Sequence, residues 1–193
     1  MSSDPRLGPY LLALARQAIA RRLGLPEPSL PAPPAAPADP APTFVTLTKR
    51  GALRGCIGCL EPRRSLPEDV ATNAQAAAFQ DSRFPPLETE EFPDIRIEIS
   101  RLSPATPLHF KDEAEAMAQL NPGRDGVILS LGGRNATFLP QVWEQLPEPR
   151  DFLSHLKRKA GLPADYWSDQ LQLARYTVEK WQETSQDTPR RPS

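Results

Sequence analysis

The sequence has few of the residues on which many protein classes depend. Two cysteines in 193 residues exclude a secreted disulfide scaffold, and two isolated histidines without metal-like spacing argue against a zinc site. No apolar run approaches the roughly 20 residues that span a bilayer, and the N-terminus lacks a basic, apolar leader. We therefore expect a soluble, cytoplasmic protein that needs no membrane, metal or other cofactor.

An excess of either charge is also absent. The 23 Lys and Arg residues balance 24 Asp and Glu residues, so we expect no binding to nucleic acid. The motifs of serine hydrolases, zinc proteases, phosphate-binding loops and dinucleotide-binding folds (G-x-S-x-G, H-E-x-x-H, G-x-x-x-x-G-K-[ST] and G-x-G-x-x-G) are missing as well. Any catalytic activity must therefore depend on residues outside these motifs.

Proline, by contrast, is abundant, with 24 residues. Residues 31–42, PAPPAAPADPAP, indicate an extended connector without helix or strand. A hydrophobic content of 39% is enough for a packed core. We expect one domain over residues 1–182, with the connector inside it, and a disordered polar tail over residues 183–193.

The hydrophobic pattern alternates between helical and strand periods. It predicts helices over residues 7–23, 66–80, 141–145 and 150–160. It predicts strands over residues 44–48, 52–59, 95–99, 126–131, 135–139 and 171–181. Turn signals at residues 49–51 and 132–133 join two pairs of these strands into hairpins. We therefore expect an α+β fold, with a mainly antiparallel sheet flanked by helices.

The hexapeptide Leu53-Arg54-Gly55-Cys56-Ile57-Gly58 is the most informative segment. On a strand, Arg54 and Cys56 share one face, while Leu53, Ile57 and Cys59 share the other, which we interpret as the core face. Glycine in a strand often marks a bulge or a close approach, and a neighbouring cation favours the nucleophilic thiolate. These features fit a reactive Cys56, and they also fit a small buried cysteine beside a surface arginine.

Other arrangements stay open at this stage. Cys56 and Cys59 form a C-x-x-C pair, but residues three apart on a strand point to opposite faces, so we do not expect a disulfide. A cysteine–histidine dyad with His109 or His155 is formally possible, and Glu98 or Asp81 are candidates for acid–base roles.

Several segments in the same order resemble the AMMECR domain family. They are the hexapeptide, Asp81-Ser82-Arg83-Phe84-Pro85-Pro86, Gly126-Val127, the 136–143 segment ATFLPQVW and the helix that begins near Phe152. The resemblance implies an α/β fold with a larger and a smaller lobe. It also implies a shared pocket lined by Arg54, Cys56, Asp81 and Arg83, with Asn73, Thr137 and Gln141 as further substrate-binding candidates. Cys59 departs from the family pattern, so C-x-x-C redox chemistry is not a family trait. Ser82 is a second departure, since it stands where the family loop usually has proline.

Bacterial members of the family often accompany a radical-SAM protein and a Memo-like protein in a set called AmmeMemoRadiSam. The resemblance therefore implies these two proteins as partners, but it supplies no reaction. Our first hypothesis is an enzyme or enzyme component in which Cys56 is a nucleophile or group carrier for an unknown small molecule or peptide. In it, Arg54 or Arg83 binds an anionic group. The alternative is a non-catalytic module that docks its partners through the hexapeptide face.

Overall fold

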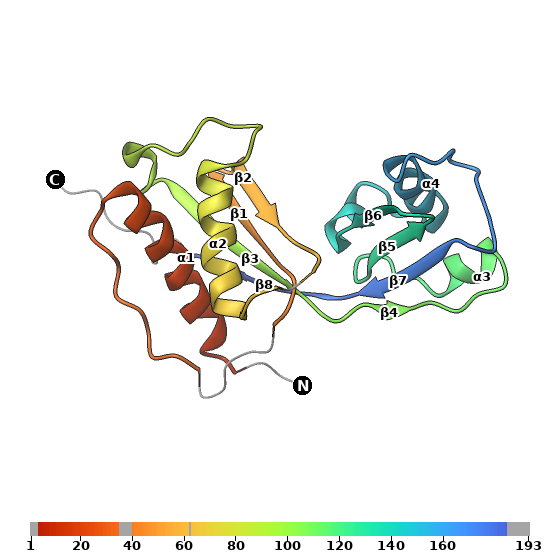
Figure 1. The fold of residues 1–193 in the computed structure, drawn as a ribbon, viewed down its shortest axis with the longest axis horizontal. Coiled ribbons are helices and arrows are strands. Elements are labelled where there is room, and N and C mark those ends of the chain that lie inside the picture. Colours follow the sequence, from red (N-terminus) through yellow and green to blue (C-terminus); the bar gives the residue numbers. More distant parts are fainter. Residues whose placement is uncertain (1–3, 35–39, 62, 185–193) are drawn as a thin grey trace. The chain divides into compact units, whose positions relative to one another are not determined.

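The computed structural model describes residues 4–34, 40–61 and 63–184. Over these residues the chain forms four α-helices and two antiparallel four-stranded sheets, which confirms the α+β expectation (Figure 1). It divides into two compact units, one made of Met1–Arg101 with Glu179–Ser193 and the other of Leu102–Val178. None of the helices in the described ranges is both long enough and apolar enough to cross a bilayer.

In the first unit, two helices cover one face of a sheet whose strand order is β2-β1-β3-β8 (Figure 1). The elements are α1 (Leu7–Leu23), β1 (Thr43–Lys49), β2 (Ala52–Gly58), α2 (Leu66–Phe79), the 3₁₀ turn η1 (Thr89–Glu91), β3 (Ile95–Leu102) and β8 (Val178–Gln182). The core lies between α1, α2 and the inner side chains of β1 and β3.

Local signals explain where the helices begin and end. Gly24 ends α1 with a left-handed φ of 69°, a conformation that glycine adopts without steric cost. A capping box between Ser65 and Glu68 starts α2. The buried face of α2 includes Ala74 and Ala77, whose small side chains let the helix lie close to the sheet. The predicted first hairpin, β1 with β2, is confirmed.

A bulge at Arg54 changes the predicted faces of β2. The register pairs Leu47 with Gly55 but Thr48 with Leu53, so Arg54 is the extra residue. Leu53 consequently lies on the side of Thr48 and is 44% exposed, and our assignment of Leu53 to the core was wrong. Gly55 lies against α2, where a Cβ atom would come within 2.1 Å of the Ala77 carbonyl oxygen.

Two polar residues, one in α1 and one near the C-terminus, are buried together. Arg16 of α1 forms a buried ion pair with Glu183 at 2.5 Å. Glu183 also accepts the Ile97 backbone N–H at 2.9 Å. The expected disordered tail therefore does not begin at residue 183, and residues 185–193 lie outside the described residues.

In the proline-rich connector, residues 31–34 and 40–42 carry neither helix nor strand, as predicted, and residues 35–39 are not described.

The second unit has a sheet with strand order β4-β7-β5-β6. Its elements are β4 (Thr106–Pro107), α3 (Glu113–Ala118), β5 (Gly126–Leu131), β6 (Arg134–Phe138), the 3₁₀ turn η2 (Pro140–Glu144), α4 (Pro149–Lys159) and β7 (Gln172–Tyr176). The predicted β5–β6 hairpin is confirmed. In the core of this unit, the Phe152 ring stacks on the Trp143 ring at a centroid distance of 3.7 Å.

The single strand predicted over residues 171–181 is two strands that belong to different sheets. The break falls at Thr177, whose backbone N–H donates to the Ser103 hydroxyl at 3.0 Å. The Thr177 carbonyl accepts the Ser103 backbone N–H at 2.9 Å. Residues 176–178 are Tyr, Thr and Val, which favour strands, so the sequence pattern does not reveal this break. Its cause is a partner more than 70 positions away.

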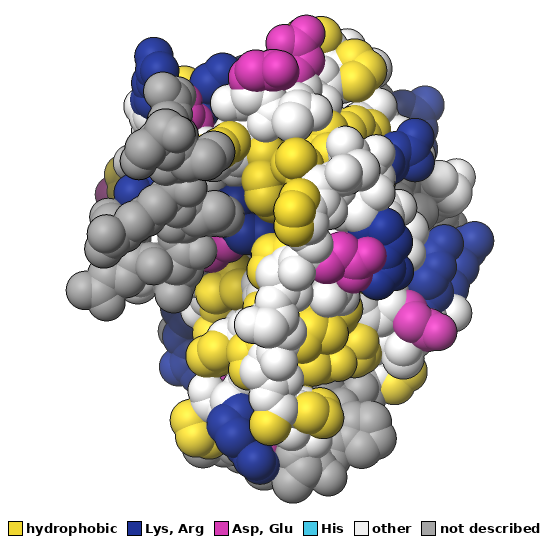
Figure 2. All heavy atoms as spheres, turned by 90° about the vertical axis from the view of Figure 1, so that its left-hand side faces the viewer, with side chains coloured by type: hydrophobic (Ala, Val, Ile, Leu, Met, Phe, Trp, Pro, Cys, Tyr) yellow, Lys and Arg dark blue, Asp and Glu magenta, His cyan; other side chains and the backbone are white. Residues whose placement is uncertain are grey.

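Charges of both signs are mixed on the surface. On the face drawn in Figure 2, Lys and Arg side chains lie beside Asp and Glu side chains. The exposed ion pairs Arg6–Asp4, at 2.7 Å, and Arg21–Glu27, at 2.8 Å, have the same character.

Candidate functional site

The thiol of Cys56 lies on the face of the β2-β1-β3-β8 sheet that the two helices leave uncovered. Cys56 is paired with Thr46 of β1, and Thr46 is paired with Glu98 of β3. The Thr46 hydroxyl donates to Cys56 Sγ at 3.3 Å, and Lys180 forms an ion pair with Glu98 at 3.4 Å. Cys56 is half-buried, so it sits in a polar row across the sheet and is not a buried hydrophobic residue.

The loop after α2 holds the backbone of Cys56 through Asp81. The Asp81 carboxylate accepts the Cys56 backbone N–H at 2.9 Å, and it also accepts Nε and Nη2 of Arg83 at 2.9 and 2.6 Å. Arg83 Nη2 in turn donates to the Cys56 carbonyl at 3.4 Å. Because β2 is an edge strand, these side chains satisfy the outward N–H and C=O that a further strand would otherwise bind.

The electrostatics of this pair follow from its geometry. Hydrogen bonding to the Arg83 guanidinium holds the pKa of Asp81 well below its usual range. The hydrogen bond to Asp81 also raises the pKa of Arg83. Asp81 is buried, whereas 54% of the Arg83 side chain is exposed. Arg83 therefore offers an accessible cation beside Cys56.

Arg54 is held differently. Its Nε and Nη2 donate to the Glu91 carboxylate at 3.0 and 2.7 Å, and this pairing lowers the pKa of Glu91 to about 2. Lys49 donates to the same carboxylate at 2.8 Å. Nη1 of Arg54 is buried and has no hydrogen-bond partner among the described residues. The charge of Arg54 is thus neutralised inside the protein and is not presented to solvent.

Phe84 connects the two arginines. Its ring centroid lies 5.5 Å from the Arg83 guanidinium carbon and 6.0 Å from that of Arg54. Both distances fit cation–π contacts. Cys56, Asp81, Arg83 and Arg54 are therefore brought together by the hexapeptide and the D-S-R-F-P-P loop.

Asn73 belongs to a separate cluster in the same unit. Its amide donates to the Thr43 hydroxyl at 2.9 Å and to the fully buried Asp69 carboxylate at 3.0 Å. The Cys59 thiol lies 3.6 Å from Asp69, and burial together with this carboxylate raises the pKa of Cys59. Cys59 is half-buried among polar groups, so our expectation of a core position was wrong. Both cysteines are free thiols.

The remaining candidates belong to the second unit. The Thr137 hydroxyl donates to the Val127 carbonyl and lies 2.9 Å from the Tyr176 hydroxyl, and Gln141 lies in η2. His109 and His155 are also in this unit, and the His155 ring lies against the Asp151 carbonyl of its own helix. Over the described ranges, no three His, Cys, Asp or Glu side chains gather as metal ligands would.

Sequence reasoning missed three residues near Cys56. Thr46 was within reach, because the hairpin register places it opposite Cys56. Phe84 lay in the recognised loop but had no assigned role. Glu91, the partner of Arg54, carried no signal, since it lies 37 positions away in a 3₁₀ turn that the hydrophobic pattern did not predict.

Comparison with known proteins agrees with this architecture. The family model AMMECR1 matches residues 12–181. A protein of Methanopyrus kandleri is 38% identical over 170 residues, covering 83% of this chain and 80% of its own. A protein of Thermococcus gammatolerans is 36% identical over 96% of this chain and 93% of its own. The crystal structure of an uncharacterised protein from Pyrococcus horikoshii superposes with a TM-score of 0.82 at 32% identity, covering 98% of this chain and 96% of its own. The chain belongs to the AMMECR1 family.

Proposed function

We propose that the protein is an enzyme or enzyme component in which Cys56 is the nucleophile or group carrier and Arg83 binds an anionic group of the substrate. One observation carries the proposal. The Cys56 sulfur lies on the uncovered face of the sheet, while its own backbone N–H and C=O are both fixed by the Asp81–Arg83 pair. A reactive atom held on a fixed strand is what positioning for catalysis requires.

The chemistry that fits this geometry is attack by sulfur on an electrophilic carbon. A sulfur–carbon bond forms, the bond from that carbon to its leaving group breaks, and the thiol proton passes to solvent. The hydrogen bond from the Thr46 hydroxyl to the sulfur strengthens as negative charge develops there. The substrate is then carried as a covalent adduct until a second nucleophile removes it.

Arg83 suits the anion-binding role better than Arg54. The Arg54 guanidinium is buried and bound to Glu91, so a ligand reaches it only by displacing that carboxylate. The Arg83 side chain is more than half exposed, and its planar guanidinium matches a carboxylate or phosphate. We therefore assign Arg54 to the support of the loop, through Glu91 and Phe84.

The test is alkylation with substoichiometric iodoacetamide, followed by peptide mass spectrometry. We expect Cys56 to be labelled well before Cys59, because burial and Asp69 keep the Cys59 thiol protonated. Cys59→Ser should retain this labelling and Cys56→Ser should lose it. Equal labelling of the two thiols in the native protein, or none at either, would overturn the proposal.

A docking role is the second candidate, and the exposed Leu53 favours it. This side chain is 44% exposed on the same face of the hexapeptide strand as Cys56, which fits an apolar anchor for a partner protein. The family context suggests the radical-SAM and Memo-like proteins as partners. Co-purification with either should then be lost in Leu53→Ser and retained in Cys56→Ser. The opposite pattern would exclude docking as the role of this face.

A further inference from the structure

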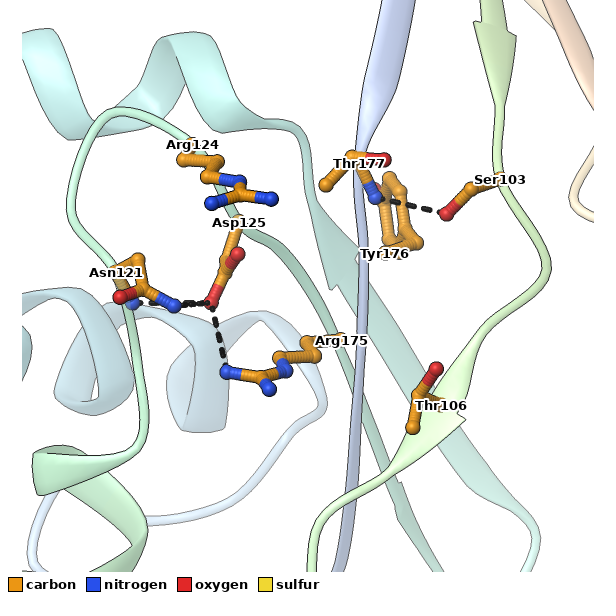
Figure 3. Close-up of a pocket in the computed structure, with 8 residues that line it drawn as sticks. All are labelled: Ser103, Thr106, Asn121, Arg124, Asp125, Arg175, Tyr176 and Thr177. Carbon is orange, nitrogen blue, oxygen red and sulfur yellow. Dashed lines mark hydrogen bonds and ion pairs between the residues drawn. The ribbon is translucent and has the colours of Figure 1, made fainter. Parts of the chain in front are cut away.

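The second unit contains a small polar pocket that none of the roles above uses. Its volume is about 160 Å³, and it lies between the 103–106 segment, the 121–125 turn and the end of β7 (Figure 3). Arg124, Arg175 and Thr106 reach it from these three segments. We call it the Arg124–Arg175 pocket. The space fits one small ligand or a few water molecules.

The charge inside the pocket is positive. Arg175 donates to the Gln119 carbonyl at 2.8 Å and lies 3.7 Å from the Asp125 carboxylate. That carboxylate is buried and also accepts the backbone N–H and the side-chain amide of Asn121, both at 3.0 Å. Figure 3 draws no ion pair or hydrogen bond from the Arg124 guanidinium to the other residues around the pocket. Two guanidinium groups therefore face one carboxylate that is already satisfied.

The pocket is held in shape before any ligand arrives. The two reciprocal bonds between Ser103 and Thr177 tie the 103–106 segment to the end of β7. Antiparallel pairing places Thr106 directly opposite Arg175. A preformed site of this kind loses little conformational entropy when a ligand binds.

Tyr176 connects the pocket to two segments that resemble the family pattern, Gly126-Val127 and residues 136–143. Its hydroxyl donates to the Phe138 carbonyl at 3.1 Å and lies 2.9 Å from the Thr137 hydroxyl. A Cβ atom on Gly126 would come within 2.3 Å of the Tyr176 ring, so only glycine leaves room for it. Burial raises the pKa of Tyr176 to about 12, so the phenol stays neutral and adds no negative charge to the pocket.

We propose that the Arg124–Arg175 pocket is a binding site for a phosphate group, either inorganic phosphate or the phosphate of a small phosphomonoester. Guanidinium groups form charge-assisted hydrogen bonds with phosphate oxygens. Here the hydrogen-bond donors come from three segments and do not lie in one plane. This arrangement suits a tetrahedral anion better than a planar carboxylate. The site is independent of Cys56, because all of its lining residues belong to the second unit.

The experiment is calorimetric titration of the full chain with inorganic phosphate at low ionic strength. We expect saturable one-to-one binding that weakens as salt is added. Arg124→Gln should weaken it about tenfold or more, since one charge-assisted hydrogen bond is lost. Arg150→Gln is the matched control, because it removes an exposed arginine from the same unit but outside the pocket, and it should bind as the wild type does.

Two further measurements test the proposal. Thr106→Ala should weaken binding by a smaller factor, which provides a second test if Arg124→Gln does not fold. Amide resonances of residues 103–106, 121–125 and 175–177 should shift on titration, and those of α4 should not. No saturable binding, equal losses in Arg124→Gln and Arg150→Gln, or acetate binding as tightly as phosphate would each overturn the phosphate assignment.

Discussion

Removing the Asp81 carboxylate should loosen the hexapeptide strand by an amount that the structure allows us to work out. Asp81 accepts the Cys56 backbone N–H and the Arg83 guanidinium. An unsatisfied, partly buried backbone N–H costs about 1–3 kcal/mol. The Arg83 pair is more than half exposed on the arginine side and contributes about 1 kcal/mol at most. Asp81→Ala should therefore lower the free energy of unfolding by about 1–4 kcal/mol.

Asp81→Asn separates the two contributions. The amide oxygen still accepts the Cys56 N–H, whereas the negative charge beside Arg83 is lost, so the cost should be only about 1 kcal/mol. Urea unfolding followed by fluorescence measures both values, and Glu27→Gln, in the exposed pair with Arg21, is the control with little effect. If Asp81→Ala is no less stable than Glu27→Gln, then Asp81 does not brace β2 and the reasoning is wrong.

Three further predictions concern stability. Glu183→Ala should lower the free energy of unfolding, measured in urea, by about 3–5 kcal/mol, because it leaves the Arg16 charge buried without its carboxylate partner. A wild-type midpoint would mean that residue 183 behaves as part of the tail. Gly55→Ala should unfold at clearly lower temperature, since its Cβ atom meets the Ala77 carbonyl, whereas Ala52→Gly, at an exposed position of the same strand, should change little. Because the pKa of Glu91 falls from 4.5 to about 2 on folding, the stability it adds is present above pH 4.5 and lost as the pH falls towards 2. Glu91→Gln should therefore flatten the dependence of the free energy of unfolding on pH in this range, and an unchanged slope would contradict the prediction.

The sequence predicted most of the regular structure, because the first unit is built from local signals that agree. Helix α1 begins and ends where its apolar stripe and Gly24 place it, and both hairpins follow their turn residues. The errors arose where long-range partners decided the outcome. Glu183 is ordered by an arginine on the first helix, and the strand after residue 171 is interrupted by Ser103.

The candidate site could be predicted only in part. Alternation correctly placed Cys56 on the uncovered face, but the bulge at Arg54 moved Leu53 out of the core, and only the register reveals a bulge. The family resemblance pointed to Asp81 and Arg83, and the structure gives them contacts with the Cys56 backbone. The structure places Asn73 apart from these residues, in a hydrogen bond to Asp69. The periodicity of a helix identifies which face is buried but not which residue lies against it.

The central claim is that Cys56 is a reactive thiol beside an anion-binding Arg83. The most direct measurement is the ratio of alkylation rates at Cys56 for iodoacetate, which carries a carboxylate, and iodoacetamide, its neutral analogue. The ratio cancels changes in thiol reactivity that affect both reagents. We predict that it is higher at Cys56 than at Cys59 and falls in Arg83→Gln. A ratio that is the same in the wild type and in Arg83→Gln would contradict the account.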